Sequence, residues 1–134
     1  MSVAVLIITH YEIGHALVNA LRTTYGDSVP LILETFEVPS DADPDKLLPE
    51  LNIIIKRLDQ GNGVLILTDL FGSTPSNIAY ELQKESHIRI VTGLNLPMLI
   101  RVMNYPSLSL ADLAEKAMKG GQAGIIGSGD VLSD

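Results

Sequence analysis

The stretch that decides the fold is VLILT over residues 64–68, which is followed by Asp69 and by the loop LFGST. A second apolar run, VAVLIIT over residues 3–9, is followed in the same way by His10. Short continuous runs of Val, Ile and Leu are typical of strands that are buried on both faces of a parallel sheet. Both runs therefore predict central strands of an α/β domain, each with an ionisable side chain at its carboxyl end.

Strand and helix patterns alternate along the rest of the chain. Two more strands are expected over residues 30–36 and 87–92. Apolar residues at helical spacing predict five helices, which begin near residues 12, 43, 75, 97 and 110. This alternation predicts a single doubly wound, mostly parallel sheet with helices on both faces.

Several residues are expected to mark the ends of these helices. Gly26 is expected to end the first helix, and the pair Thr74 and Pro75 reads as a hydroxyl cap followed by a first-turn proline. Gly120 and Gly121 are expected to end the last helix. A short strand is expected after them, over residues 123–126.

The order of the strands determines whether His10 and Asp69 meet. The flavodoxin-like order 2-1-3-4 is one of the common doubly wound arrangements, and with right-handed crossovers it places the first and third strands side by side. Ligands of such sheets bind outside the carboxyl ends of the strands, where the strand order reverses. We therefore expect His10 and Asp69 to face each other across one crevice.

Composition excludes several classes of function. The 134 residues are 46% hydrophobic and contain no cysteine, which predicts one globular domain without disulfides, thiol catalysis or zinc–thiolate sites. The formal net charge of -7 and the scarcity of aromatic residues argue against nucleic acid as a partner. The apolar run at residues 3–9 is too short for a signal or membrane segment, so a cytoplasmic protein is expected. No cofactor or metal site is expected, because nothing fixes the geometry of the acidic residues.

The two strand ends suggest phosphoryl transfer. An aspartate that binds one ring nitrogen of a histidine leaves the other nitrogen free to attack, and it stabilises the positive charge that develops on the ring. Gly72, Ser73 and Thr74 offer backbone N–H groups and hydroxyls for phosphoryl oxygens at a helix start. Neither loop contains Lys or Arg, which disfavours a nucleoside triphosphate.

The residues alone leave other interpretations open. His10 could be an ordinary loop residue, Asp69 could cap a turn, and Ser73 and Thr74 could serve only as helix caps. The same crevice could also bind a small ligand without turnover. The other two histidines are expected to be structural: His15 as a surface residue of the first helix, and His87 at the start of the fourth strand, at the amino end of the sheet and away from the site.

Three segments resemble the mannose-family IIA component of the bacterial phosphoenolpyruvate:sugar phosphotransferase system (PTS). They are VLIITH over residues 5–10, LILTDLFGSTPSN over residues 65–77 and GLNLPML over residues 93–99. The resemblance implies that His10 accepts a phosphoryl group from the phosphohistidine of the carrier HPr and passes it to a IIB partner. It implies that Asp69 orients the ring.

The resemblance extends to supporting residues and to assembly. Thr74 matches a hydroxyl residue of the phosphoryl-binding loop, and Thr9, Phe71, Asn95 and Pro97 are expected to support the site. The family is typically a homodimer that exchanges a C-terminal strand, which here is the run at residues 123–126. Residues 1–126 would then form the IIA domain, and residues 127–134 a flexible acidic tail.

One residue departs from the family pattern. Tyr11 follows His10 where many members have glycine, so access of the partner to His10 is expected to differ. No IIB sequence is seen after the domain, so the acceptor is expected to be another polypeptide, and a regulatory readout of phosphorylation is an alternative to transport. Another alternative is the related domain that serves as phosphodonor to a dihydroxyacetone kinase.

Overall fold

A computed structural model describes residues 2–129 of the chain and contains one sheet of four parallel strands in the order β2-β1-β3-β4. The strands are β1 (Ala4–His10), β2 (Leu33–Val38), β3 (Val64–Thr68) and β4 (Ile88–Thr92). The helices are α1 (Ile13–Tyr25), α2 (Pro44–Leu58), α3 (Thr74–Gln83), α4 (Leu96–Met103) and α5 (Leu110–Ala123). The predicted doubly wound fold and its strand order are confirmed.

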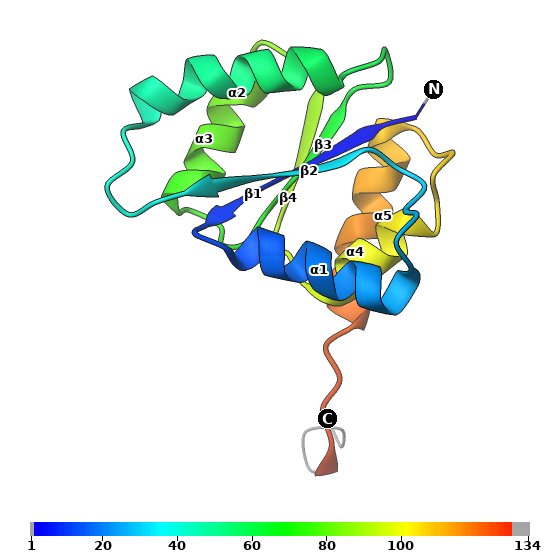
Figure 1. Cartoon of the computed structure of the whole chain (residues 1–134). Helices are drawn as coiled ribbons and strands as arrows, with labels where there is room; N and C mark the ends of the chain where they lie inside the picture. The colour runs from blue at the N-terminus through cyan, green and yellow to red at the C-terminus, as the bar shows by residue number, and fades with distance from the viewer. Residues whose placement is uncertain (1, 130–134) are drawn as a thin grey trace.

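Helices cover both faces of the sheet (Figure 1). Helices α2 and α3 lie on one face, and α1, α4 and α5 lie on the other. Successive side chains of β1 point to opposite faces, so Leu6 packs in the core beneath α2 and α3 with Ile78, whereas Ile7 packs in the other core with Leu99. This double burial explains why β1 and β3 are continuous apolar runs.

Helix α5 continues through Gly120 and Gly121, so the prediction that these glycines end it is wrong. A Cβ atom on Gly120 would lie 2.4 Å from the Cβ atom of Arg101, and one on Gly121 would lie 2.9 Å from Cε of Met98. Both neighbours belong to α4. The two glycines therefore allow α4 and α5 to approach closely.

The predicted strand over residues 123–126 is absent from this single chain. Ala123 is the last residue of α5, and no strand is present over residues 124–126. The chain leaves the body of the molecule after α5 (Figure 1), with Ile125 and Ile126 79% and 81% exposed. The proposed tail lies partly outside the described residues, which end at residue 129.

The edges of two elements also differ from the sequence pattern. The buried face of α1 contains Gly14, Val18 and Leu21, whereas Ile13 is 46% exposed. Strand β2 begins at Leu33, where it pairs with Val5 of β1, and not at residue 30. Within residues 2–129, no helix is long and apolar enough to cross a membrane.

Candidate functional site

The carboxyl ends of β1 and β3 bring His10 and Asp69 together. The two strands are neighbours, and their parallel ladder ends at the pair Ile8 and Thr68. Beyond it, Nδ1 of His10 lies 2.8 Å from Oδ2 of Asp69. The backbone N–H of His10 donates to the same oxygen at 3.2 Å. The side chain of Asp69 thus extends the contact between the two strands by one residue and holds both the main chain and the ring of His10.

The backbone around His10 is fixed by neighbouring elements. The N–H of Tyr11 donates to the carbonyl oxygen of Val38 at the end of β2 (3.2 Å). The hydroxyl oxygen of Thr9, which is buried, accepts a hydrogen bond from the N–H of Gly14 in the first turn of α1 (2.9 Å). Thr9 therefore joins the end of β1 to the start of α1, and the position of His10 does not depend on its own side chain.

The two side chains differ in their access to solvent. The side chain of His10 is 37% exposed, whereas that of Asp69 is 11% exposed. An ionised carboxylate can only accept, so Nδ1 of His10 carries the proton of this hydrogen bond and Nε2 is the nitrogen with a free lone pair. The pair can therefore present an oriented, neutral imidazole nucleophile to a group that approaches from solvent.

The loop between β3 and α3 differs in detail from the prediction. Ser73, and not Thr74, is the residue that precedes the helix, because Ser73 has extended backbone angles and Thr74 is already helical. Both the N–H and the hydroxyl of Ser73 donate to the carbonyl oxygen of Leu70, at 3.4 and 2.6 Å. Gly72 has a φ of 80°, which lets the loop turn at this point. The Ser73 hydroxyl is thus engaged within the loop, while Gly72 and Thr74 are exposed at the positive end of α3.

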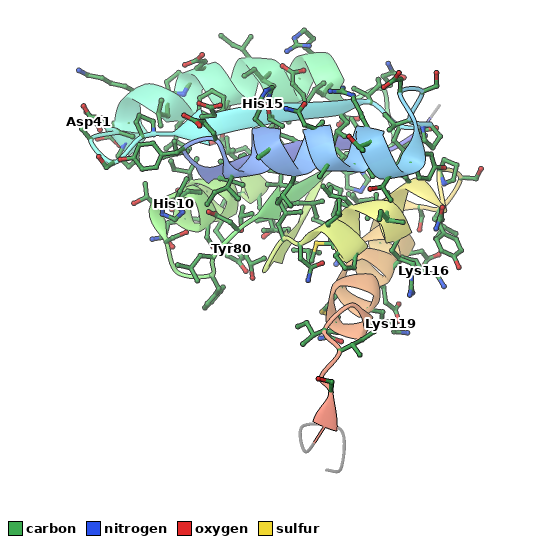
Figure 2. The ribbon with its side chains drawn as sticks, turned by 60° about the horizontal axis from the view of Figure 1, so that its bottom comes forward. His10, His15, Asp41, Tyr80, Lys116 and Lys119 are labelled. Carbon is green, nitrogen blue, oxygen red and sulfur yellow. The ribbon has the colours of Figure 1, made fainter. Side chains whose placement is uncertain are left out.

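An aromatic pair flanks this loop. Phe71 is 69% exposed, and its ring contacts the ring of Tyr80 on α3 edge to face, with ring centres 6.2 Å apart. Figure 2 shows Tyr80 and His10 on the same side of the molecule. Tyr80 therefore supports the outer side of the loop, a role that helical spacing alone did not indicate.

Asn95 and Pro97 contact α5 instead of the histidine. The side-chain oxygen of Asn95 accepts from the N–H of Met98 (2.9 Å), and its NH₂ group donates to the carbonyl oxygen of Gly121 (3.1 Å). A Cβ atom on Gly124 would lie 2.3 Å from Cβ of Pro97. Between residues 2 and 129, the structure contains no hydrogen bond from either residue to His10 or Asp69. Both instead hold the end of α5, from which the C-terminal segment leaves.

Three buried oxygen atoms near the loop lack a hydrogen-bond partner within the described part of the chain. They are Oδ1 of Asp69, the hydroxyl of Thr68 at the end of β3, and the hydroxyl of Ser76 on the inward face of α3. Buried polar atoms without partners cost about 1–3 kcal/mol each and are uncommon away from functional sites. Sequence reasoning missed Thr68 and Ser76. Sequence reasoning could have identified them, because each places a hydroxyl residue at a position where the strand or helix pattern predicts an apolar one.

A cavity lies beside the loop, between the starts of α2 and α3. Its volume is about 140 Å³. Its lining residues are Pro44, Leu48, Thr74, Asn77, Ile78 and Glu81. Thr74 is thus shared between the loop and the cavity.

The side chains of Asp and Glu provide the charge in the loops around the site. The loops that follow the four strands contain Glu12, Asp41, Asp43 and Asp69 but neither Lys nor Arg. Asp43 caps α2 by accepting from the N–H of Asp45 (3.0 Å). The described residues include no group of His, Cys, Asp and Glu side chains that could hold a metal ion.

The other histidines lie apart from this pair. His15 is exposed on α1, and Figure 2 shows it well separated from His10. His87 precedes β4, at the amino end of the sheet, and is also exposed. The exposure of His15 and the position of His87 at the amino end of the sheet agree with the predictions.

Comparison with known proteins identifies the family. The family model for mannose-type IIA proteins, described as PTS system fructose IIA component, matches residues 4–118. The sorbose-specific EIIA component of Lacticaseibacillus casei is 32% identical over 120 residues, which cover 86% of this chain and 83% of that protein. The mannose-specific EIIAB component of Escherichia coli (strain K12) is 27% identical over 128 residues, which cover 93% of this chain. The chain spans 39% of the length of that E. coli protein.

Solved structures support the same fold. The mannose/sorbose-specific IIA subunit from Enterococcus faecalis superposes with a TM-score of 0.83 at 23% identity, over 96% of both chains. The EIIA component from Streptococcus agalactiae superposes with a TM-score of 0.81 at 22% identity, over 93% of this chain and 96% of that chain. With the family match over most of its length, the chain belongs to the mannose-type IIA family of the phosphoenolpyruvate:sugar phosphotransferase system.

Proposed function

We propose that this protein is a phosphoryl carrier of a sugar phosphotransferase system and that His10 carries the phosphoryl group. The observation that supports this most directly is the 2.8 Å contact between Nδ1 of His10 and Oδ2 of Asp69, on a histidine whose side chain remains 37% exposed. One ring nitrogen is held by a carboxylate and the other is left to react. A structural histidine at a strand end has no need of such a partner.

The chemical step is a transfer between two imidazoles. Nε2 of His10 attacks the phosphorus atom of a phosphohistidine on the donor, the donor's P–N bond breaks, and its electron pair returns to the donor imidazole. The His10 ring keeps its proton on Nδ1 and becomes a phosphorylated imidazolium. Asp69 stabilises this positive charge through the existing hydrogen bond.

The start of α3 is suited to the phosphoryl oxygens. The backbone N–H groups of Gly72 and Thr74 lie at the positive end of this helix, where anions bind favourably. Ser73 contributes mainly by closing the loop, because its hydroxyl donates to the carbonyl oxygen of Leu70. A single phosphoryl group suits this loop better than a triphosphate, since the loop contains no cationic side chain.

Membership of the family supports the following choice of partners. The donor is phospho-HPr and the acceptor is a IIB component, in the cytoplasm. A regulatory role, in which a partner reads the phosphorylation state of His10, uses the same first step. The protein acts as a homodimer in which the C-terminal segment of each copy pairs with the other.

The test is the intact mass of the protein after incubation with phosphoenolpyruvate, enzyme I and HPr. The wild-type protein is expected to gain one acid-labile phosphoryl group, and His10→Ala is expected to gain none. His15→Ala is the matched control, since it removes an exposed histidine of α1 and is expected to be labelled like the wild type. Circular dichroism would establish that both variants are folded.

Two outcomes would contradict the proposal. Full labelling of a folded His10→Ala protein would place the phosphoryl group elsewhere. No labelling of the wild-type protein, with charged HPr present, would favour a binding module that uses the same crevice without turnover.

A further inference from the structure

Tyr11 has an unusual backbone conformation for its residue type. Its φ is 44°, and within residues 2–129 it is the one residue other than glycine with a positive φ. A bulky side chain is disfavoured in this left-handed region because its Cβ approaches the following carbonyl oxygen. Such outliers persist where the surrounding structure forces them, and they cluster at functional sites.

The packing of α1 against β1 forces this conformation. A Cβ atom on Gly14 would lie 2.6 Å from Cγ2 of Ile7, so the first turn of α1 lies directly against the strand. The Gly14 N–H is bound to the hydroxyl oxygen of Thr9, and the Tyr11 N–H is bound to the carbonyl oxygen of Val38. Helix α1 begins at Ile13, so the chain must reverse within two residues. The turn needs a left-handed residue at position 11 whatever the side chain there.

The turn therefore explains the conformation but not the tyrosine. Glycine or asparagine would adopt this conformation with little strain. Tyr11 is 51% exposed, so burial in the core does not account for the tyrosine either. It directly follows His10, at the end of the sheet where the loop after β3 also exposes Leu70 (61%) and Phe71 (69%). Large exposed apolar side chains from two loops thus lie at the same end of the sheet as the exposed histidine.

We propose that Tyr11 is a specificity-determining contact for the protein that presents the phosphoryl group to His10. This inference rests on the proposed function. Tyrosine supplies a large, rigid and partly apolar contact at little entropic cost, which is why it is enriched among the residues that dominate binding energy. The strain at position 11 is retained because glycine or asparagine would remove that contact.

The surroundings of Tyr11 define the partner's chemistry. A partner that docks over the exposed Leu70 and Phe71 needs an apolar patch around its own phosphorylated residue. Glu12 and Asp41, in loops that contain no cation, favour cationic side chains at the border of that patch. The expected partner is therefore a protein with an apolar patch and a basic border, and not a small phosphorylated metabolite.

The test compares a protein donor with a small one. Wild type, Tyr11→Gly, Tyr11→Asn and Tyr11→Phe are phosphorylated by increasing concentrations of phospho-HPr, and separately by phosphoramidate. In the second reaction the P–N bond of phosphoramidate breaks, ammonia leaves and the phosphorus bonds to Nε2 of His10. Phosphoramidate is small enough to reach the histidine without docking, so the two donors separate recognition from chemistry.

The glycine and asparagine variants are expected to raise KM for phospho-HPr by at least about tenfold, with kcat nearly unchanged. Their rates with phosphoramidate should match the wild type. Tyr11→Phe, which keeps the ring, should behave like the wild type with both donors. The unfolding midpoints of the glycine and asparagine variants should be no lower than that of the wild type, because both residues fit the left-handed conformation.

Other results would overturn the inference. An unchanged KM for phospho-HPr in the glycine and asparagine variants would show that the ring takes no part in docking. Equal losses with both donors would mean that Tyr11 acts on His10 itself. A wild-type protein that phosphoramidate labels on His10 but phospho-HPr does not would reject HPr as the partner, and with it this role of Tyr11. A wild-type protein labelled by neither donor would reject the proposed function as well.

Discussion

Oδ2 of Asp69 accepts two hydrogen bonds from one residue, the ring of His10 at 2.8 Å and its backbone N–H at 3.2 Å. The backbone bond anchors the carboxylate at the strand end, so the ring bond acts on a partner that is already in place. The other oxygen, Oδ1, is buried and without a hydrogen-bond partner in the described part of the chain. This single side chain therefore combines a structural contact with the orientation of the proposed nucleophile.

Asp69→Asn is expected to reduce the rate of His10 phosphorylation by at least about 100-fold, because an amide can donate to Nδ1 and select the wrong tautomer of the ring, as in the serine-protease triad. It also removes the negative charge that stabilises the phosphorylated imidazolium. The measurement is a rapid-quench time course with saturating phospho-HPr. Since the loss belongs to the chemical step, KM should change little.

Asp27→Asn is the matched control for this substitution. Asp27 is an exposed carboxylate between α1 and β2, at the amino end of the sheet and away from His10. A kcat for Asp27→Asn within about twofold of the wild type is expected. An Asp69→Asn protein with wild-type kcat would contradict the role given to Asp69.

At the scale of elements, α4 and α5 pack closely because the last turns of α5 contain glycine. Gly120 and Gly121 are both buried, and the side chains of Arg101 and Met98 occupy the space that Cβ atoms would need. The same end of α5 is held by Asn95, whose NH₂ group donates to the carbonyl oxygen of Gly121. The contact between these helices thus sets the direction in which the C-terminal segment leaves.

Gly120→Ala is expected to destabilise the protein. Overpacking in a closed contact costs about 1–3 kcal/mol, and alanine recovers about 1 kcal/mol of this through its better helix propensity. The closest contact would be with Cβ of Arg101, which cannot move independently of the α4 backbone, so the overpacking cost should prevail. Urea unfolding followed by circular dichroism would measure the difference.

Gln122→Ala serves as the control, because Gln122 is exposed in the same last turn of α5. Its free energy of unfolding should stay within about 0.5 kcal/mol of the wild type or rise slightly. If Gly120→Ala were as stable as Gln122→Ala, the two glycines would not be required for the packing of α4 on α5.

At the scale of the whole molecule, β2 and β4 are the outer strands of the sheet in the described part of the chain. Ile125 and Ile126 project from the body beyond α5, and they are more exposed than any other large apolar residues in the described part of the chain. Two adjacent, highly exposed isoleucines offer an apolar surface that a partner could cover. They support the proposed homodimer, in which this segment pairs with a second copy.

Replacing Ile125 and Ile126 together by aspartate is expected to weaken the dimer at least about tenfold, because burial of each isoleucine contributes about 1.5–3 kcal/mol and a buried carboxylate opposes association. Sedimentation velocity over a range of protein concentrations would measure the dissociation constant. The fold of each subunit should persist, since neither side chain belongs to the core.

Ile53→Asp is the control for this pair, because Ile53 is 69% exposed on α2, in a different part of the molecule. It is expected to leave the dissociation constant unchanged. A wild-type protein that sediments as a monomer at every concentration would reject the homodimer, and an unchanged dissociation constant for the aspartate variant would place the interface elsewhere.

Much of the fold was predictable because its signals are local. The apolar runs that form β1 and β3, the helical spacing between them, and the end of α1 at Gly26 follow from residues close together in sequence. The end of α5 was not predictable in this way. Gly120 and Gly121 look like a helix stop, and only the side chains of α4 explain why the helix continues.

The same distinction between local signals and tertiary contacts applies to the site. Position at the ends of two buried strands was sufficient to select His10 and Asp69 and to expect their contact. It did not indicate that the Ser73 hydroxyl is engaged by Leu70, that Asn95 and Pro97 face α5, or that Thr68 and Ser76 have buried hydroxyls without partners. The roles predicted for Gly72, Ser73, Asn95 and Pro97 at the site stay predictions, which phosphorylation of the protein would test.

By itself, the sequence determined the α/β class, the family and the pair of strand ends where the site lies, because hydrophobic periodicity and short motifs are properties of neighbouring residues. The tertiary structure alone decided the strain at Tyr11, the length of α5 and the absence of a strand over residues 124–126 in the single chain. Each of these depends on contacts between elements far apart in sequence: α1 against β1, α4 against α5, and the end of α5 against Asn95 and Pro97. Such contacts determine how much space one element leaves for another, and a local sequence pattern contains no information about that space.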